Sequence, residues 1–276
     1  MDSNEYGERP ADVLERVVAT GPPELYVVAP SRNTLEALVE VGTDRLDRDE
    51  SLPELRVLAD EGLLKTLFDD FLLASRAADV VEADRLAFGT LAASDRAPIL
   101  VSEASVVAMV EASGRVGGLS ADDDEFVAAV RETVAADWES ADAYELRTPG
   151  ISRVQETMAE AVSAEAREDF DEVLASMGSV RGDSDGIDEV AASLLAAARN
   201  RELLYDVSKW GEDVGLASKA TFSRTKSRLE NLGIIETEKV PIDVGRPRLR
   251  LTLADDRLQE ADPDELANVA ASALAS

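Results

Sequence analysis

The 276-residue chain contains neither cysteine nor histidine. Without cysteine it has no disulfide, no thiolate metal site and no cysteine nucleophile. Without histidine it has no Ser-His-Asp triad, none of the usual zinc sites and no imidazole acid–base catalyst. A glycine-rich phosphate loop of the Walker or dinucleotide-binding type is also missing. We therefore expect no catalytic residues, no metal and no cofactor, and we interpret the chain as a non-enzyme.

Long apolar runs are missing too. No run approaches the roughly 20 residues that are needed to span a bilayer. The first ten residues are acidic and polar, unlike a signal peptide. We therefore expect a cytoplasmic protein with no membrane association, long enough to hold two domains.

Lysine is scarce and acids are abundant. The chain has 57 Asp and Glu against 28 Lys and Arg, only five of them lysine, and its net charge is -29. Such a composition resembles that of proteins from salt-loaded halophiles, especially haloarchaea, where hydrated carboxylates keep chains apart in screening salt. A disordered acidic chain is the alternative. The acids are interleaved with periodic apolar residues, so a folded halophilic protein is favoured.

The first 145 residues alternate helix and strand signals. Apolar spacing predicts helices at 10–19, from Ser31 to a stop near Gly42, at 63–67, at 68–81 and at 121–138, the last with Phe126, Val127, Val130, Val134 and Trp138 on its apolar side. Short apolar runs predict strands at 24–29, 54–59, 85–92, 97–102 and 105–111, and a loop is expected at 114–120. This order predicts an α/β domain, an open mixed sheet with covering helices.

The C-terminal quarter has the order of a winged helix-turn-helix. Helices are expected at 190–199 and 202–214, then a turn at 215–217 and a third helix at 219–232, which Ser218 can cap and Gly233 can end. Two strands, 234–240 and 248–253, follow, and the connector 241–247 forms the wing between them.

Positive charge is concentrated in this module. Residues 217–250 hold eight Lys or Arg against four Asp or Glu, a net charge of +4 in a chain of -29. On the third helix, Phe222, Thr225, Leu229 and Leu232 share one face, and the opposite face carries small, polar and basic residues, as a helix in the major groove requires. Gly245-Arg246-Pro247 resembles a minor-groove arginine insertion. The candidate DNA-contact residues are Lys219, Ser223, Arg224, Lys226, Ser227, Arg228, Arg246 and Arg248.

Each of these features also has an ordinary structural interpretation. A basic helix face can simply be solvated, and a Gly-Arg-Pro turn can be only a hairpin. Their conjunction within one positive island favours binding to double-stranded DNA. A winged-helix protein–protein adaptor without DNA binding is the alternative. Catalysis by paired carboxylates, such as Asp69 with Asp70, is weaker still, because such pairs arise by default among 57 acids.

A family resemblance supports this interpretation. The run L-Y-D-V-S-K-W at 204–210 and the run S-K-A-T-F-S-R-T-K-S-R-L-E-N-L-G-I-I-E at 218–236 resemble the haloarchaeal transcriptional regulators of the TbsP type. The resemblance covers most of the chain and is firmest over 200–253. It implies transcription regulation, association with TrmB-type control of central sugar metabolism, and no catalysis. The first domain resembles, more loosely, the phospholipase-D-like effector domains of TrmB relatives, whose catalysis needs histidine.

We accordingly divide the chain into three parts. Residues 1–145 form a sensor or dimerisation domain, 146–186 form connecting helices and a linker at 178–186, and 187–276 form the DNA-binding domain with a C-terminal helix at 263–275. The segment 151–177 is helical, as one helix or two. Phosphate contacts weaken as salt rises, so we expect a homodimer that doubles them, with 151–177 and 263–275 as candidate dimer surfaces.

A small-molecule effector is a further hypothesis. In an open α/β sheet a ligand site lies beyond the strand ends, here near 30–33 and 60–62. Ser31, Arg32, Asn33 and Asp60 have suitable polar side chains, although helix caps and loops explain them equally.

Overall fold

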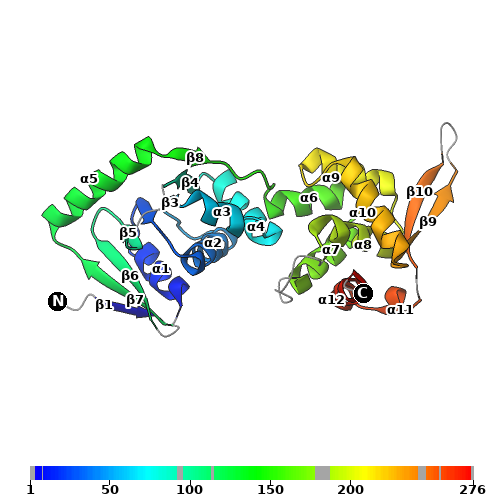
Figure 1. Cartoon of the computed structure of the whole chain (residues 1–276), viewed down its shortest axis with the longest axis horizontal. Coiled ribbons are helices and arrows are strands. Elements are labelled where there is room, and N and C mark those ends of the chain that lie inside the picture. Colours follow the sequence, from blue (N-terminus) through cyan, green and yellow to red (C-terminus); the bar gives the residue numbers. More distant parts are fainter. Residues whose placement is uncertain are drawn as a thin grey trace. The chain divides into compact units, whose positions relative to one another are not determined.

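The protein consists of two compact units, Met1–Gly150 and Ile151–Ser276 (Figure 1). The computed structural model describes residues 4–7, 9–91, 96–112, 115–177, 187–241, 247–254 and 256–274. No helix in these ranges is both long enough and apolar enough to cross a bilayer.

The first unit is built on one mixed sheet in the order β1-β7-β6-β5-β2-β3-β4-β8. Strands β2, β3 and β4 pair in parallel, and every other neighbouring pair is antiparallel. This confirms the expected open mixed sheet. The strands are β1 (Asn4–Gly7), β2 (Glu24–Val28), β3 (Glu54–Ala59), β4 (Leu86–Thr90), β5 (Ile99–Val101), β6 (Val106–Ala112), β7 (Arg115–Ala121) and β8 (Asp142–Tyr144).

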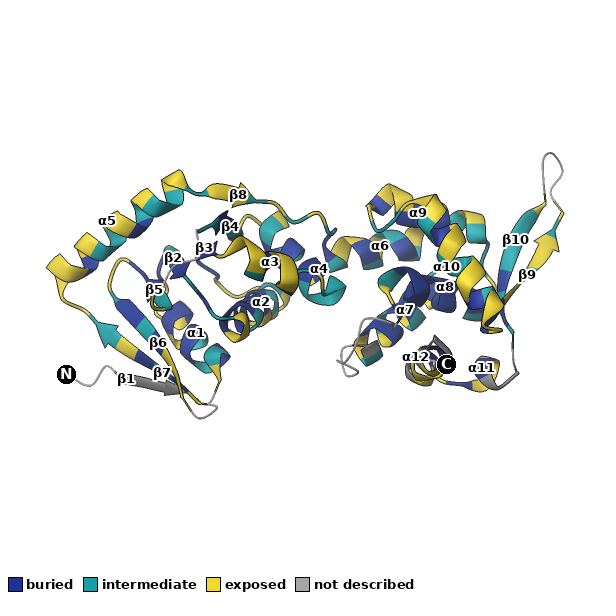
Figure 2. Ribbon diagram, in the orientation of Figure 1, coloured by how far each residue is buried: buried dark blue, intermediate teal, exposed yellow. Residues whose placement is uncertain are grey.

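Helices cover both faces of this sheet. Leu25 and Val27 of β2 belong to the core under α1–α4, and Tyr26 and Val28 belong to a second core under α5 (Figure 2). Successive strand residues point to opposite faces, so a strand that is covered on both sides is apolar throughout. The helices are α1 (Pro10–Ala19), α2 (Arg32–Asp47), α3 (Glu61–Leu67), α4 (Phe71–Glu82) and α5 (Asp124–Ser140).

Three expectations for this unit are wrong. Helix α2 does not stop near Gly42 but continues to Asp47, and Gly42 instead allows close packing, because a Cβ there would lie 3.3 Å from the methyl groups of Val80. The expected loop at 114–120 is strand β7, whose Gly117 and Gly118 pair with β6. Phe126, expected on the apolar side of α5, is half-exposed.

The second unit contains the expected winged helix. Helices α8, α9 and α10 are followed by the hairpin β9–β10, in which Arg248 pairs with Val240. The segment before α9 joins this sheet through a bridge between Leu203 and Arg250. The elements are α6 (Ile151–Ala161), α7 (Ala164–Met177), α8 (Glu189–Arg199), α9 (Leu204–Val214), α10 (Lys219–Asn231), β9 (Ile235–Val240), β10 (Arg248–Leu253), α11 (Asp256–Glu260) and α12 (Pro263–Leu274).

The segment 151–177 forms two helices, and they pack within the second unit instead of connecting two domains. The ring of Phe170 on α7 meets the ring of Trp210 on α9 edge to face, with 6.2 Å between centroids. The Trp210 indole N–H donates a hydrogen bond to Thr157 Oγ1 on α6 at 3.0 Å. The division therefore falls at 150/151 and not in the expected linker 178–186, which lies outside the described residues.

Candidate nucleic-acid interface

Helix α10 is positioned by its caps and by two buried side chains. The Ser218 Oγ accepts the Thr221 N–H at 3.2 Å, and Gly233 follows the helix with a φ of +67°, a conformation that glycine adopts at low cost. Phe222 and Leu229, seven residues apart on one face, are fully buried. The helix packs against α8, α9 and β9, so its opposite face is turned to solvent.

The approach of α9 to α10 depends on a glycine. A Cβ on Gly211 would lie 2.3 Å from the ring of Phe222, which no real contact allows. Gly215 then ends α9 in the left-handed region with a φ of +88°. These two glycines permit the tight turn that presents α10.

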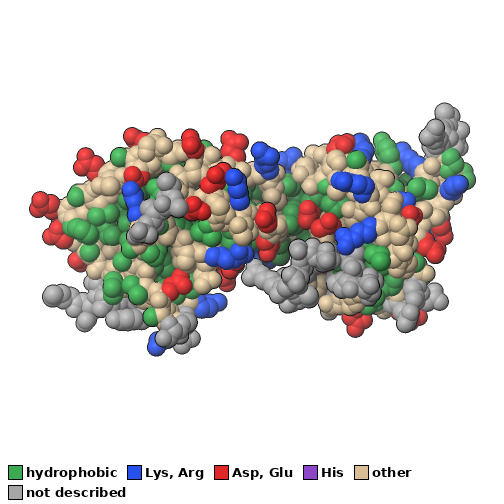
Figure 3. All heavy atoms as spheres, in the orientation of Figure 1, with side chains coloured by type: hydrophobic (Ala, Val, Ile, Leu, Met, Phe, Trp, Pro, Cys, Tyr) green, Lys and Arg blue, Asp and Glu red, His purple; other side chains and the backbone are tan. Residues whose placement is uncertain are grey.

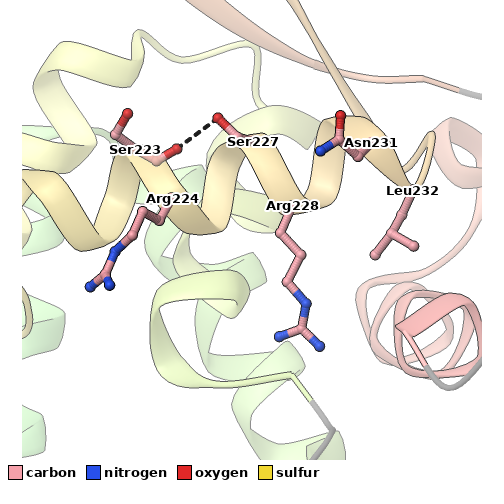
Figure 4. Close-up of a pocket in the computed structure, with 6 residues that line it drawn as sticks. All are labelled: Ser223, Arg224, Ser227, Arg228, Asn231 and Leu232. Carbon is pink, nitrogen blue, oxygen red and sulfur yellow. Dashed lines mark hydrogen bonds between the residues drawn. The ribbon is translucent and has the colours of Figure 1, made fainter.

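Ser223, Arg224, Ser227, Arg228, Asn231 and Leu232 line a shallow open depression along the exposed face of α10. Acidic side chains are spread over both units on the face shown in Figure 3. In Figure 4, Arg224 and Arg228, one turn apart, extend to the same side of the helix, and the Ser227 hydroxyl donates to the Ser223 carbonyl at 3.0 Å. Within the described ranges no carboxylate lies at ion-pair distance from either arginine, and Arg224 contacts only the Thr221 hydroxyl at 3.3 Å. We call Ser223, Arg224, Ser227, Arg228 and Asn231 the α10 face.

Two of the predicted lysines are already paired inside the protein. Lys219 donates to Glu212, and this contact raises the pKa of the lysine and lowers that of the carboxyl. Lys226, with 14% of its side chain exposed, donates to Glu230 at 2.8 Å, and Glu230 also accepts from Thr237 on β9. Lys226 therefore points to the hairpin and does not join the α10 face. Leu232, predicted to be buried, is instead partly exposed at the end of α10.

Arg248 lies beside an aromatic ring that the sequence interpretation did not single out. Its guanidinium stacks 4.2 Å from the ring centroid of Tyr205 and lies 3.3 Å from Asp206 Oδ1. Tyr205 is half-exposed in the first turn of α9. Sequence reasoning could have found it, because it is an aromatic residue that lies outside the apolar stripe of that helix. Arg246, the predicted minor-groove arginine, lies outside the described residues.

Two family models together match almost the whole chain. The N-terminal model of TbsP-like transcriptional regulators matches residues 2–149, and the C-terminal HTH-domain model of TbsP-like transcriptional regulators matches residues 150–271. The chain belongs to the TbsP-like transcriptional regulators. The two matches meet where the structure divides into its two units, and the family is one of regulators and not of enzymes.

Likenesses to solved structures are distant. TrmBL2, an archaeal chromatin protein whose structure shows a novel mode of DNA binding, is 16% identical over 51% of this chain and 54% of its own, with a TM-score of 0.36. Nuc from Salmonella typhimurium, a phospholipase D family member, is 12% identical over 52% of this chain and 98% of its own, with a TM-score of 0.36. The chain thus spans about half the length of TrmBL2. No curated protein matches the sequence.

In this TbsP-like regulator two of the four residues expected to hold an effector, Ser31 and Asp60, act as helix caps, and Arg32 and Asn33 lie in the first turn of α2. Ser31 caps α2 and donates to Glu111 at 2.6 Å, and Asp60 caps α3 through the Leu63 N–H at 3.0 Å. Arg32 pairs with Glu36. A separate open groove of about 680 Å³ runs between α3 and β8, where its polar lining includes Glu61, Lys65, Asp69, Thr90, Tyr144 and Arg147. Among the described residues, no group of three or more Asp or Glu is placed to hold a metal ion.

Proposed function

We propose that this protein is a sequence-specific DNA-binding transcriptional regulator that binds promoters as a homodimer in the cytoplasm of a salt-loaded, haloarchaeal cell. The observation that carries the proposal is the α10 face. In a chain of net charge -29, Arg224 and Arg228 stand one turn apart on an exposed helix face, and no described carboxylate lies at ion-pair distance. Membership of a family of HTH transcriptional regulators supports it.

The proposed contacts follow from the chemistry of each side chain. Arg224 and Arg228 can bind guanine edges or phosphates, and Ser223, Ser227 and Asn231 can hydrogen-bond to base edges in the major groove. Lys219 and Arg248 would contact phosphates only after exchanging a carboxylate partner, and Arg246 would reach the minor groove from the wing. Lys226 has a positioning role in this proposal, because it holds Glu230, which accepts the hydroxyl hydrogen bond of Thr237 on β9.

A dimer is proposed because high salt weakens each phosphate contact. The logarithm of DNA affinity falls by about 0.9 per log unit of salt for each phosphate neutralised. A single winged helix with few free cations would bind poorly in molar salt. Two copies on a pseudo-palindromic site double the contacts and also set the half-site spacing.

The first unit is the proposed sensor domain. Its groove between α3 and β8, at about 680 Å³, has the size of a small-molecule site (~300–1,000 Å³). Control of central carbon and sugar metabolism is proposed from the TbsP-type resemblance alone. A thermal-shift screen of phosphorylated sugars and nucleotides tests the groove. We expect a ligand that raises the melting temperature of the natural protein but not that of Lys65→Ala/Arg147→Ala. A screen in which no compound shifts the melting temperature would reject the hypothesis of a small-molecule effector.

Chromatin immunoprecipitation across the genome, in the native salt-loaded cell, tests the whole proposal. We expect sharp promoter peaks for the natural protein and none for Arg224→Glu/Arg228→Glu. Arg48→Glu/Arg153→Glu, which changes the net charge equally at exposed positions that do not belong to the α10 face, should keep the peaks. Peaks that persist in the α10 variant would contradict the proposed contacts. A flat profile for the natural protein would favour the adaptor alternative.

A further inference from the structure

The hairpin β6–β7 is unusually poor in charge for this chain. Residues 104–121 contain one acid, Glu111, and one base, Arg115, whereas the chain as a whole holds 57 acids in 276 residues. The hairpin therefore provides a region where the acidic surface is interrupted.

One face of the hairpin is free of carboxylates. Val107 and Met109 belong to the core under α1–α4, so the alternating residues Ala108 and Val110 lie on the opposite face, toward α5. On that face Ala108 pairs with Leu119, and Val110 pairs with Gly117. Glu111 lies on the α1–α4 side, where it accepts the Ser31 hydroxyl hydrogen bond. The face of the hairpin toward α5 is therefore apolar apart from one charged residue, Arg115.

Helix α5 leaves this face partly uncovered. The only fully buried residues of α5 are Val127 and Val134. Val110 is 47% exposed and Leu119 is 48% exposed, and Phe126 in the first turn of α5 is 49% exposed. Hydrophobic side chains gather beside α5 and over the hairpin on the face shown in Figure 3. Phe126 directly follows the acidic run 122–125 and is left out of this surface. We call Val110 and Leu119 the hairpin patch.

The surfaces that the sequence suggested for dimerisation are used within the chain. Val154 and Met158 of α6 and Phe170 of α7 are fully buried in the second unit, and Leu266 and Ala270 of α12 are buried there as well. Helix α12 packs on α7. The apolar stripes of these helices therefore serve the monomer's own core.

We propose that the hairpin patch is the surface through which two copies of this chain associate. The inference rests on the proposed dimeric regulator and names its interface. The chain carries a net charge of -29, so two copies repel one another least where carboxylates are missing. A two-fold interface places the same patch of each copy against the other, and an apolar face without carboxylates is complementary to itself. Apolar contacts also persist in molar salt, which screens ion pairs.

Cross-linking of single-cysteine variants tests the interface directly, because the natural chain contains no cysteine. The full-length variants Val110→Cys and Leu119→Cys are treated with a short bismaleimide in molar KCl. Val269→Cys is the matched control, since Val269 is 47% exposed on α12. We expect covalent dimers from the first two variants and none from the control. A covalent dimer from the α12 variant alone would overturn the proposal, and so would a natural chain that is monomeric by light scattering.

A second variant separates this inference from DNA binding. Leu119→Asp should be a monomer by light scattering, with unchanged circular dichroism, while Val269→Asp stays a dimer. A natural chain that is monomeric yet binds promoter DNA would refute the interface and the homodimer, and would leave the DNA-binding part of the proposed function intact. A dimer linked through Leu119 that binds no DNA would refute the function and leave the interface. If Leu119→Asp fails to fold, the cysteine variants still decide.

Discussion

At the scale of single residues, a lysine or arginine is available to bind DNA only if no carboxylate of the protein already pairs with it. Lys219 and Lys226 each donate to a carboxylate of the second unit, whereas Arg224 and Arg228 have none within ion-pair distance among the described residues. A paired cation brings little net attraction to a phosphate, because its carboxylate is repelled as the lysine is attracted. The sequence correctly placed all four residues on one helix, but it could not tell which were already neutralised.

Arg228→Ala and Lys226→Ala should therefore behave differently. Loss of Arg228 should weaken binding and reduce the salt slope of the logarithm of affinity by about 1, as expected for one lost phosphate contact. Loss of Lys226 should leave the slope unchanged, because its ammonium is held by Glu230. Fluorescence anisotropy of a labelled DNA duplex that the natural protein binds, titrated with each variant at several KCl concentrations, measures the two salt slopes. Equal reductions in the two variants would show that Lys226 contacts DNA after all.

At the scale of elements, local signals predicted the winged helix well and the edges of the sheet poorly. Ser218, Gly215 and Gly233 mark the ends of α9 and α10, and the alternation of Leu249, Leu251 and Leu253 marks β10. Strands β1 and β8 escaped prediction because their pairing is not local, and β7 was missed although it pairs with its neighbour β6. The glycines of β7 are typical of a loop, and three- or four-residue edge strands carry almost no pattern of their own.

The contact between α9 and α10 gives a prediction at this scale. Gly211→Ala should destabilise the protein by about 1–3 kcal/mol, the usual cost of overpacking, because the new methyl group meets the Phe222 ring. Phe222→Leu should relieve part of this clash. Urea denaturation of both single variants and of the double variant measures the coupling. Strictly additive losses would mean that the two residues do not meet.

At the scale of the whole molecule, the apolar stripes of α6 and α7 were recognised and assigned to the wrong partner. A stripe of buried residues predicts a packed face, but it does not say whether the partner is the same chain or a second copy. Phe170 and Thr157 instead meet Trp210 of the winged helix. A division of the chain into an N-terminal and a C-terminal part was expected, and the structure places it at 150/151.

This packing predicts which fragment can fold alone. Residues 151–276 should unfold cooperatively in urea, and residues 187–276 should be unfolded or much less stable, because they lose the contacts of Trp210 with α6 and α7. Each fragment holds Trp210 as its single tryptophan, so fluorescence reports that site alone. If 187–276 unfolds cooperatively at the same urea concentration as 151–276, then α6 and α7 are not part of the core.

The central claim is that the α10 face reads DNA sequence. The most direct measurement selects bound sequences from a random duplex library, with purified full-length protein in molar KCl. We expect a defined, pseudo-palindromic motif for the natural protein and for Lys226→Ala, and no enrichment for Arg224→Ala/Arg228→Ala. An identical motif from the double-arginine variant, or no motif from the folded natural protein, would contradict the account.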